Sequence, residues 1–535
     1  MGKRKEVIYY NNRFKGKFLT DDDCDRLEKL KVLAESDGVI EDLLDSIYVL
    51  SDEQVEQVLE TKISEFIDKE KGELRPDQTT ALGYLLVSKR CLLADSVGLG
   101  KTVIVAGLIN ILKDLYKKKG HEFRYLYLTE KNLVKETQTG KLVKFTGEYV
   151  KSVFGEKQNV EKFIEEWNNG EHCSIIGPYS LINSVLFQEF FREYDSIDES
   201  PFDLLIMDEP SILNNSATKT FKNALYFRDF FDRIILLDAT PLDKELMSKY
   251  NKLNFMDETL LPTKTNFSKE YEIFDYTGPY PVRCNKYKNE EDFKYKIAYR
   301  ALGRTRKSLM KAQGMDVETE GMVNCSANLV VSKLSIEQRE LLKKTSMKYM
   351  VYDCPWYLDS SIEMNTITTP KLQSLVDLLD GELKDVEQII IYSRYKEAQW
   401  GIYNVLDELG YSAKIMNGDT ELEEKNNLIT GFKNGEYNCL ITNVMKGLDF
   451  GNCDICVFYS YDPNPSKMIQ FEGRITRSFK IENKHIYVLV SKGEELRKLK
   501  TTIKDRAKAI KNFEEDEFSC VMDLLLKSKE LNNGK

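Results

Sequence analysis

The stretch Cys91-Leu-Leu-Ala-Asp-Ser-Val-Gly-Leu-Gly-Lys-Thr102 decides how the rest of the chain is interpreted. A short apolar run, Cys91–Ala94, precedes Gly98, Gly100 and a Lys-Thr pair, and the helical-looking segment Val103–Leu112 follows. This order predicts a strand, a phosphate-binding loop and a helix. Glycines let backbone N–H groups surround a polyphosphate at the helix N-terminus, the lysine neutralises the outer phosphates, and the threonine hydroxyl binds Mg²⁺.

The match to the generic phosphate-loop pattern is partial. Gly-x-x-x-x-Gly-Lys-[Ser/Thr] requires a glycine where Asp95 stands, so the pattern fits only from Gly100 onward. The alternative is a glycine-rich turn between a strand and a helix that happens to precede Lys-Thr. Motifs elsewhere in the chain therefore have to decide between a nucleotide site and a simple turn.

The composition is typical of a globular protein with several domains. The chain has 535 residues, of which 42% are hydrophobic and 31% charged, and this length predicts about three or four domains. No apolar run approaches the roughly 20 residues of a membrane span, and residues 1–11 are charged rather than signal-like. We expect a cytoplasmic protein without membrane association.

Cysteines, histidines and net charge exclude several classes of site. Most of the ten cysteines lie in apolar runs, which indicates buried thiols in a reducing compartment. Cys453-x-x-Cys456 lacks a second pair at metal-ligand spacing. The chain has only three histidines, which argues against histidine-based catalysis. The net charge of −10 argues against a basic coat for nucleic acid but allows a local positive groove.

Residues 71–255 alternate short apolar runs with helical patterns, which predicts a doubly wound parallel α/β domain. In such a sheet, functional groups lie at the carboxyl ends of the strands. The expected strands are Cys91–Ala94, Tyr125–Leu128, Cys173–Ile176, Leu204–Met207 and Ile234–Leu237.

Polar motifs directly follow three of these expected strands. Besides the phosphate loop, Asp208-Glu209 follows Leu204–Met207, and Asp238-Ala239-Thr240-Pro241 follows Ile234–Leu237. We expect Asp208 to hold Mg²⁺ through its water shell, and Glu209 to orient or deprotonate an attacking water. The acidic pair therefore supports a nucleotide-hydrolysing site.

Residues 366–500 predict a second α/β domain, which has no phosphate loop of its own. Its expected strands are Ile389–Tyr392, Cys439–Ile441, Cys456–Tyr459 and Ile486–Val490. Arg474 and Arg477 are three residues apart and point the same way on a helical turn. They either form surface salt bridges or reach a nucleotide held by the first domain and stabilise charge during phosphoryl transfer.

Three further regions complete the chain. Residues 1–70 are acidic and helical, with a capping box at Ser51-x-x-Gln54, and form either a packed accessory domain or an arm for protein partners. Residues 256–365 have weak periodicity and predict an inserted or bridging region with some helix. Residues 501–535 predict a charged C-terminal helix.

In this order the motifs resemble those of the superfamily-two helicase-like ATPases, and most closely the Swi/Snf-type DNA translocases, over residues 74–495. Leu74–Gln78 resembles the family's adenine-reading glutamine motif, and Leu92–Thr102 resembles its nucleotide loop, Asp95 included. The other matching segments are Tyr179–Ile182, Asp208-Glu209, Asp238–Pro241, Arg304–Lys307, Leu334–Gln338, Pro370–Leu372, Ile391–Ser393, Asn417–Asp419, Thr442–Phe450 and Gln470–Arg477.

The resemblance implies two RecA-like lobes with ATP and Mg²⁺ between them. It assigns nucleotide binding to Gln78, Asp95, Gly98, Gly100, Lys101, Thr102, Gly447, Asp449 and Gln470. It assigns catalysis to Lys101, Asp208, Glu209, Arg474 and Arg477, and the Mg²⁺ site to Thr102 and Asp208. It assigns nucleic-acid contacts to Tyr179, Thr240, Ser393 and Thr442.

Two departures from the family pattern affect the assignment. Ser211 stands where the family usually has histidine after the acidic pair, and Thr442–Asp449 reads more like the DEAD-box version of its motif. A compact relative from a bacterium or a virus-infected host cell fits best. The expected function is an ATPase that is stimulated by nucleic acid and moves along double-stranded DNA.

Two alternatives remain open from the sequence. One is a strand-separating helicase on single-stranded DNA or RNA. The other is a nucleotide-gated DNA-binding subunit with weak ATPase activity, which works through residues 1–70 and protein partners.

Overall fold

The structure is a computed structural model with two compact units, which divide in sequence between Gly314 and Met315. We call their sheet-containing parts lobe 1 and lobe 2. The structure describes residues 5–6, 18–19, 74–96, 98–118, 120–135, 137–138, 142–194, 199–239, 246–275, 282–297, 300–304, 324–444, 453–460, 462, 471–472 and 483–501.

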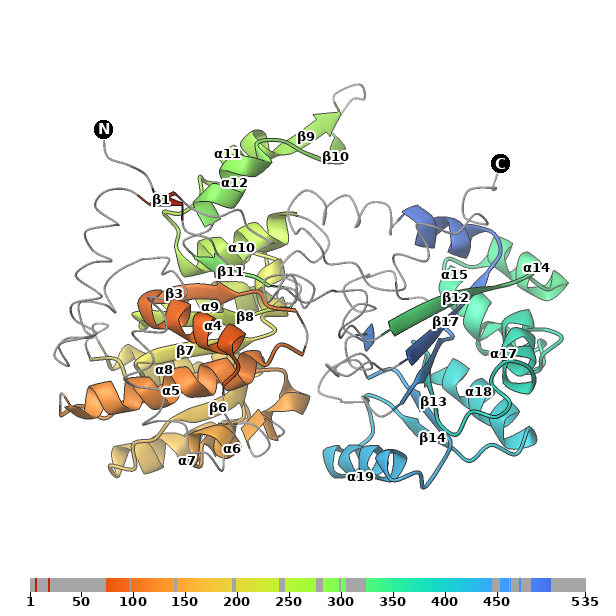
Figure 1. Cartoon of the computed structure of the whole chain (residues 1–535), viewed down its shortest axis with the longest axis horizontal. Helices are drawn as coiled ribbons and strands as arrows, with labels where there is room; N and C mark the ends of the chain where they lie inside the picture. The colour runs from red at the N-terminus through yellow and green to blue at the C-terminus, as the bar shows by residue number, and fades with distance from the viewer. Residues whose placement is uncertain are drawn as a thin grey trace. The chain divides into compact units, whose positions relative to one another are not determined.

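Lobe 1 contains a seven-stranded parallel sheet in the order β11-β3-β8-β7-β4-β6-β5 (Figure 1). All five predicted strands are present, and their ends differ from the prediction by no more than two residues. The strands are β3 (Arg90–Leu93), β4 (Tyr125–Thr129), β5 (Lys151–Ser152), β6 (Ile175–Pro178), β7 (Leu204–Asp208), β8 (Arg233–Leu237) and β11 (Ala301–Leu302).

Helices α4 (Pro76–Val87) and α5 (Lys101–Lys118) cover one face of this sheet. Their apolar residues share a core cluster with alternate residues of the central strands, such as Tyr125 and Tyr127 of β4. Proline at the first position starts α4, and the Gln78 side chain accepts a hydrogen bond from the Arg75 backbone N–H. The other long helices of the lobe are α7 (Lys157–Asn168), α8 (Val185–Arg192), α9 (Lys219–Arg228) and α10 (Leu246–Met256).

Lobe 1 extends beyond the predicted boundary at residue 255. After α10 come α11 (Lys264–Tyr271), the antiparallel pair β9 (Glu272–Asp275) and β10 (Val282–Tyr287), and α12 (Glu290–Ile297). The chain then returns to the sheet as β11, which pairs in parallel with β3. Backbone pairing holds this two-residue strand, so it leaves no period in the sequence that could have predicted it.

Lobe 2 contains a six-stranded parallel sheet in the order β12-β17-β16-β13-β15-β14. The four predicted strands are confirmed as β13 (Ile389–Tyr392), β15 (Cys439–Thr442), β16 (Ile455–Phe458) and β17 (Asn483–Ser491). Two strands were not predicted, β12 (Asn324–Ser332) and β14 (Ala413–Met416). β12 begins with polar residues inside the predicted bridging region, so this sheet starts before residue 366.

Helices of lobe 2 pack on both faces of its sheet. Alternate residues of β13 belong to two different core clusters, Ile390 and Tyr392 to one and Ile389 and Ile391 to the other. The helices are α14 (Ile336–Lys344), α15 (Lys348–Asp353), α16 (Pro355–Leu358), α17 (Pro370–Asp380), α18 (Lys396–Glu408) and α19 (Leu422–Lys433). The prediction of two parallel α/β lobes is therefore confirmed.

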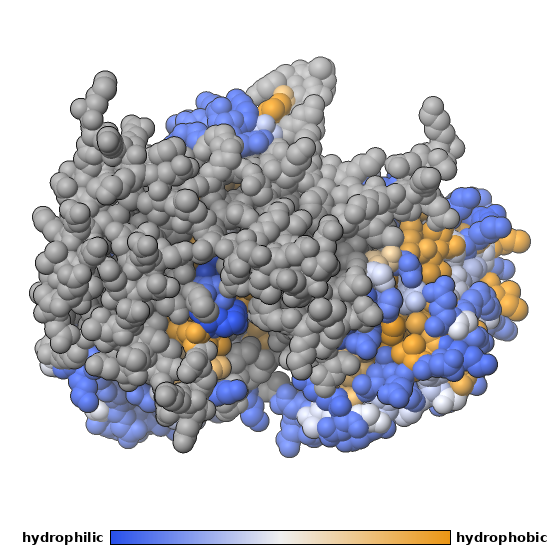
Figure 2. Space-filling view, in the orientation of Figure 1, coloured by the Kyte–Doolittle hydropathy of each residue, from blue (hydrophilic) through white to orange (hydrophobic). Residues whose placement is uncertain are grey.

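Lobe 2 also exposes large apolar side chains, and Figure 2 shows hydrophobic residues gathered on its surface. Trp400 is 58% exposed and Ile367 is 81% exposed. Met364 lies close to Gly401, the residue after Trp400. Large apolar side chains of lobe 2 therefore lie on its surface as well as in its two core clusters.

Two predicted regions lie outside the described residues. The helices expected within 1–70 cannot be compared, because only the antiparallel pair β1 (Lys5–Glu6) and β2 (Phe18–Leu19) is described there. The C-terminal helix expected within 501–535 is described only at residue 501. Among the described helices, none combines the length and the apolar character that crossing a membrane requires.

Candidate nucleotide-binding site

The loop between β3 and α5 has the backbone geometry of a phosphate loop. Gly98 and Gly100 both have φ of 86°, a left-handed conformation that glycine adopts without strain. A Cβ atom on Gly100 would collide with the side-chain amide of Gln78. Because α5 begins at Lys101, its first-turn N–H groups start directly after the loop, where they favour an anion.

Lys101 folds back over this loop. Its Nζ donates a hydrogen bond of 2.8 Å to the backbone oxygen of Asp95. The side chain is half-buried, as is that of Thr102. The ammonium group is therefore held at the mouth of the loop, where an outer phosphate would accept from it.

Asp208 ends β7 and lies beside Thr102 through a shared partner. The hydroxyl of Tyr127, on β4, donates to Asp208 Oδ2 over 3.1 Å, and the Thr102 side chain lies close enough to this hydroxyl to act on its pKa. Burial, with Asp208 adding to it, raises the pKa of Tyr127 well above its ordinary value, so this hydroxyl stays protonated. The structure thus brings together the two residues predicted to hold Mg²⁺.

These residues fit the chemistry of Mg²⁺. Mg²⁺ prefers oxygen ligands, keeps several of its waters, and usually takes one or two groups from the protein and the rest from phosphates. The Thr102 hydroxyl and the Asp208 carboxylate supply such oxygens. Among the described residues, no group of three or more His, Cys, Asp or Glu side chains could hold a metal by itself.

Glu209 has an unusual backbone conformation at the end of β7. Its φ is 53°, in the left-handed region that non-glycine residues rarely adopt. Its N–H donates to Leu237 O over 2.7 Å, and its carbonyl accepts from the Ser211 N–H over 2.7 Å. Ser211 is exposed, and its hydroxyl lies 3.3 Å from Glu130 Oε1. Backbone hydrogen bonds of Glu209 therefore fix the turn that carries the acidic pair.

Asp95 makes a buried ion pair with Arg304, and both side chains are 0% exposed. Arg304 donates from Nη2 to Asp95 Oδ2 over 2.6 Å, and from Nε and its backbone N–H to Oδ1 over 3.0 and 3.1 Å. Both carboxylate oxygens are thus occupied by protein donors. The assignment of Asp95 to nucleotide binding stays a prediction, and its described contacts are those of a residue that fixes the loop.

Gln78 is anchored on the same loop. Its Oε1 accepts from the Arg75 N–H over 3.0 Å, and its Nε2 donates to Leu99 O over 3.1 Å. Arg75 Nη2 also donates to Leu99 O over 3.0 Å, and Arg304 donates to the carbonyl of Asp77. The predicted glutamine motif and the phosphate loop are therefore one connected structure within lobe 1.

The predicted nucleic-acid contacts that the structure describes are buried. Tyr179 is 7% exposed, and its hydroxyl donates to the backbone oxygen of Asp208 over 2.7 Å. Ser393 and Thr442 are 0% exposed, and the Ser393 N–H donates to Thr442 O over 3.0 Å. Their roles toward nucleic acid stay predictions. Six predicted site residues lie outside the described ones: Thr240, Gly447, Asp449, Gln470, Arg474 and Arg477.

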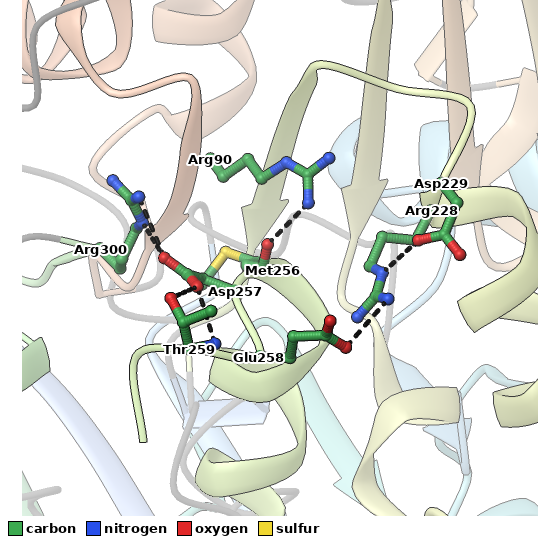
Figure 3. A pocket seen from close by; sticks show the side chains of 8 residues that line it. All are labelled: Arg90, Arg228, Asp229, Met256, Asp257, Glu258, Thr259 and Arg300. Carbon is green, nitrogen blue, oxygen red and sulfur yellow. Dashed lines mark hydrogen bonds and ion pairs between the residues drawn. The ribbon is translucent and has the colours of Figure 1, made fainter. Parts of the chain in front are cut away.

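Lobe 1 also has a pocket of about 340 Å³ at the opposite, amino-terminal edge of its sheet (Figure 3). Arg90, the first residue of β3, donates there to the carbonyls of Phe231, Asp232 and Met256. The other charged groups pair with each other, Arg228 with Asp229 and Glu258, and Arg300 with Asp257. This pocket is therefore separate from the phosphate loop, and the charged side chains that line it form ion pairs or hydrogen bonds with the surrounding protein.

Sequence reasoning missed Tyr127, the contact of Tyr179 with Asp208, and the pairing of Arg304 with Asp95. Tyr127 is 81 residues from Asp208 in sequence, and Arg304 is 209 residues from Asp95. Strand periodicity predicts which face a side chain occupies but not which group it meets. Six of the cysteines in the described part of the chain have free thiols, and Cys453 and Cys456 among them are buried.

Two family models match the chain, one in each predicted lobe. The family described as "Type III restriction enzyme, res subunit" matches residues 71–243, and "Helicase conserved C-terminal domain" matches residues 370–479. The two matches follow one another in the order that the motifs predict.

Curated relatives share about a quarter of their aligned residues with the chain. The DNA repair and recombination protein RAD54B of Mus musculus is 25% identical over 470 residues, covering 75% of this chain and 51% of that protein. The uncharacterized ATP-dependent helicase YqhH of Bacillus subtilis is 23% identical over 431 residues, covering 75% and 72%. The chain thus spans about half the length of the RAD54B relatives it matches.

Among solved structures, the SWI2/SNF2 ATPase core of Sulfolobus solfataricus in complex with double-stranded DNA is similar. It aligns with 87% of this chain and 97% of its own, with 17% identity and a TM-score of 0.39.

Proposed function

Since the chain is a superfamily-two helicase-like ATPase of the Swi/Snf type, we propose that it couples ATP hydrolysis to movement along double-stranded DNA. The observation that carries the proposal is that Thr102 and Asp208 both lie close to the Tyr127 hydroxyl beside a glycine-rich loop. This is the arrangement that a nucleotide with its Mg²⁺ requires. DNA enters the proposal because relatives such as RAD54B are named as DNA repair and recombination proteins.

Within lobe 1, the proposed chemistry uses four side chains. The loop and the first turn of α5 bind the phosphates, and Lys101 exchanges the Asp95 carbonyl for an outer phosphate. Thr102 and Asp208 hold Mg²⁺, which neutralises charge on the phosphates when it is bound. Glu209, whose backbone is held by hydrogen bonds to Leu237 and Ser211, orients or deprotonates the attacking water.

Lobe 2 contributes Arg474 and Arg477 in this proposal. As arginine fingers they would stabilise the charge that develops during phosphoryl transfer. Closing around ATP and reopening after hydrolysis would step the protein along the DNA backbone. Because backbone contacts read no bases, we expect little sequence specificity and a strong dependence on salt.

Replacing Lys101 tests the ATPase. Lys101→Ala should reduce ATP turnover to background and weaken ATP binding, because the ammonium that neutralises the outer phosphates is lost. Lys117→Ala removes an exposed lysine from the same helix and is expected to leave turnover unchanged. Steady-state turnover and circular dichroism of the full chain check both variants. Full activity in Lys101→Ala would refute the assignment of the site.

The nucleic-acid partner is tested with the unmodified chain. Turnover is compared with duplex DNA, with single-stranded DNA, with RNA and without nucleic acid. Stimulation by duplex DNA, together with displacement of a bound third strand without strand separation, supports translocation. Stimulation by a single strand favours the helicase alternative, and stimulation by none of them favours the nucleotide-gated binding subunit.

A further inference from the structure

One buried hydroxyl contacts Asp208, a proposed Mg²⁺ ligand of lobe 1, and lies near the other, Thr102. Tyr127 is 0% exposed and pairs in register with Ile206 on β7, two residues before Asp208. Its hydroxyl lies 3.1 Å from Asp208 Oδ2, and the Thr102 side chain lies close enough to act on its pKa. The hydroxyl therefore holds the Asp208 carboxylate near the first turn of α5.

The backbone of Asp208 is held separately from its carboxylate. Tyr179, which follows β6, donates to Asp208 O over 2.7 Å. The next residue, Glu209, donates its N–H to Leu237 O on β8. The backbone here is held by Tyr179 and by β8, and the hydrogen bond from Tyr127 restricts rotation of the Asp208 side chain.

Tyr125 provides an internal comparison on the same strand. It lies two residues before Tyr127, in the same core cluster, and is also 0% exposed. Its hydroxyl is buried and has no hydrogen-bond partner among the residues that the structure describes. The two tyrosines share strand, face and burial, and differ in whether the hydroxyl meets the candidate site.

We propose that Tyr127 is a positioning residue that sets the Asp208 carboxylate for Mg²⁺ before nucleotide binds. This inference rests on the proposed function. A carboxylate held in one rotamer binds a metal without first losing rotational freedom, which is the advantage of a preorganised site. The ring fills the core as a phenylalanine would, so the hydroxyl carries the effect.

The test compares Tyr127→Phe with Tyr125→Phe in the full chain. Binding of a fluorescent ADP analogue is measured with and without Mg²⁺, and ATP turnover is measured against Mg²⁺ concentration. A hydrogen bond to a charged group is worth about tenfold or more, so Tyr127→Phe should raise the Mg²⁺ concentration for half-maximal turnover about tenfold. Its metal-free ADP affinity, and every value for Tyr125→Phe, should match the unmodified chain.

Coupling to Asp208 separates positioning from a general effect on packing. In an Asp208→Asn background, Tyr127→Phe should change Mg²⁺-dependent ADP binding no further, because the group it positions has already been altered. Equal loss with and without Asp208→Asn would overturn the inference, as would equal effects of Tyr127→Phe and Tyr125→Phe. Unchanged Mg²⁺ dependence in Tyr127→Phe would overturn it while leaving nucleotide binding in place. Failure of the unmodified chain to bind ADP or ATP would instead refute the proposed function.

Discussion

The sheets of the two lobes are built alike, but the carboxyl ends of their strands carry different chemistry. In lobe 1 these ends lead into half-buried charged side chains: Lys101, Asp208 and Glu209. In lobe 2 the ends of β13, β15 and β16 carry small hydroxyl side chains with 0% exposure, Ser393, Thr442 and Ser460, and one half-buried charged residue, Arg394, follows Ser393. The comparison teaches that a parallel sheet provides positions, whereas the residues just after each strand decide whether those positions react.

Each lobe has buried charged side chains near the carboxyl ends of its strands, and the ratio of positive to negative groups differs between the two lobes. In lobe 1, Asp95 pairs one to one with Arg304. In lobe 2, Lys371 Nζ lies 2.7 Å from Asp353 Oδ1 and 2.9 Å from Glu495 Oε1, so one ammonium faces two carboxylates. Burial raises the pKa of Asp353 and of Glu495, although Lys371 opposes this. Burial also opposes the charge of Lys371, but the two carboxylates raise its pKa.

Removing the ammonium should have the largest effect on lobe 2. Lys371→Met leaves Asp353 and Glu495 buried without their cation, which should cost about 3–5 kcal/mol of local stability at neutral pH. Because the two lobes need not unfold together, hydrogen exchange of the β13 and β17 amides is the appropriate measurement. Part of the loss should be recovered at mildly acidic pH, where the carboxylates are protonated.

A nearby surface pair is the control for Lys371. Lys348 Nζ lies 2.8 Å from Glu494 Oε2, a distance like those in the buried cluster, but the two side chains are 40% and 26% exposed. Lys348→Met should therefore change the stability of lobe 2 by about 0–1 kcal/mol. If the two lysine variants exchanged equally fast, burial would not be what makes Lys371 important.

Breaking the Asp95–Arg304 ion pair should lower the stability of lobe 1 somewhat less than Lys371→Met lowers that of lobe 2. Arg304→Met strands the Asp95 carboxylate, although the backbone N–H of residue 304 still donates to it, and we expect a loss of about 3 kcal/mol. Hydrogen exchange of the β3 and β8 amides would show this loss, while lobe 2 should be unaffected. Adding Asp95→Leu should recover most of it, since a buried ion pair can be replaced by packed apolar residues. No recovery would mean that Arg304 acts through its other contacts.

The sequence predicted the interior of both sheets well and their edges poorly. Strands such as β8 and β13 are continuous apolar runs because both of their faces are buried, and such runs are visible in sequence. The edge strands β11 and β14 depend on backbone pairing with a neighbour and escaped prediction. In the site, Lys101 was found because it follows the glycines of a phosphate-loop pattern, and Asp208 because it stands at the end of a strand. The pairing of Arg304 with Asp95 was not found, because the two residues come from distant parts of the chain.

Removing the excess carboxylate of lobe 2 should have the smallest effect and should make that lobe resemble lobe 1. Glu495→Gln leaves Lys371 paired one to one with Asp353 and keeps an oxygen that can accept from the Ser491 N–H. A carboxyl whose pKa is raised in the folded state contributes stability that is lost as pH rises through that pKa. Hydrogen exchange of lobe 2 at pH 5 and pH 7.5 should therefore show a smaller loss of stability with pH in Glu495→Gln than in the unmodified chain.

Glu494, the residue before Glu495, should affect the pH dependence of lobe 2 stability in the opposite direction. Hydrogen bonding to Lys348 lowers the pKa of Glu494, so its contribution is present above the unfolded pKa and is lost as pH falls. Glu494→Gln should therefore change the pH dependence of lobe 2 in the direction opposite to Glu495→Gln. If the two variants showed equal pH slopes, the excess of carboxylates over Lys371 would not control the stability of lobe 2. The difference from lobe 1 would then lie in the half-buried side chains at the strand ends.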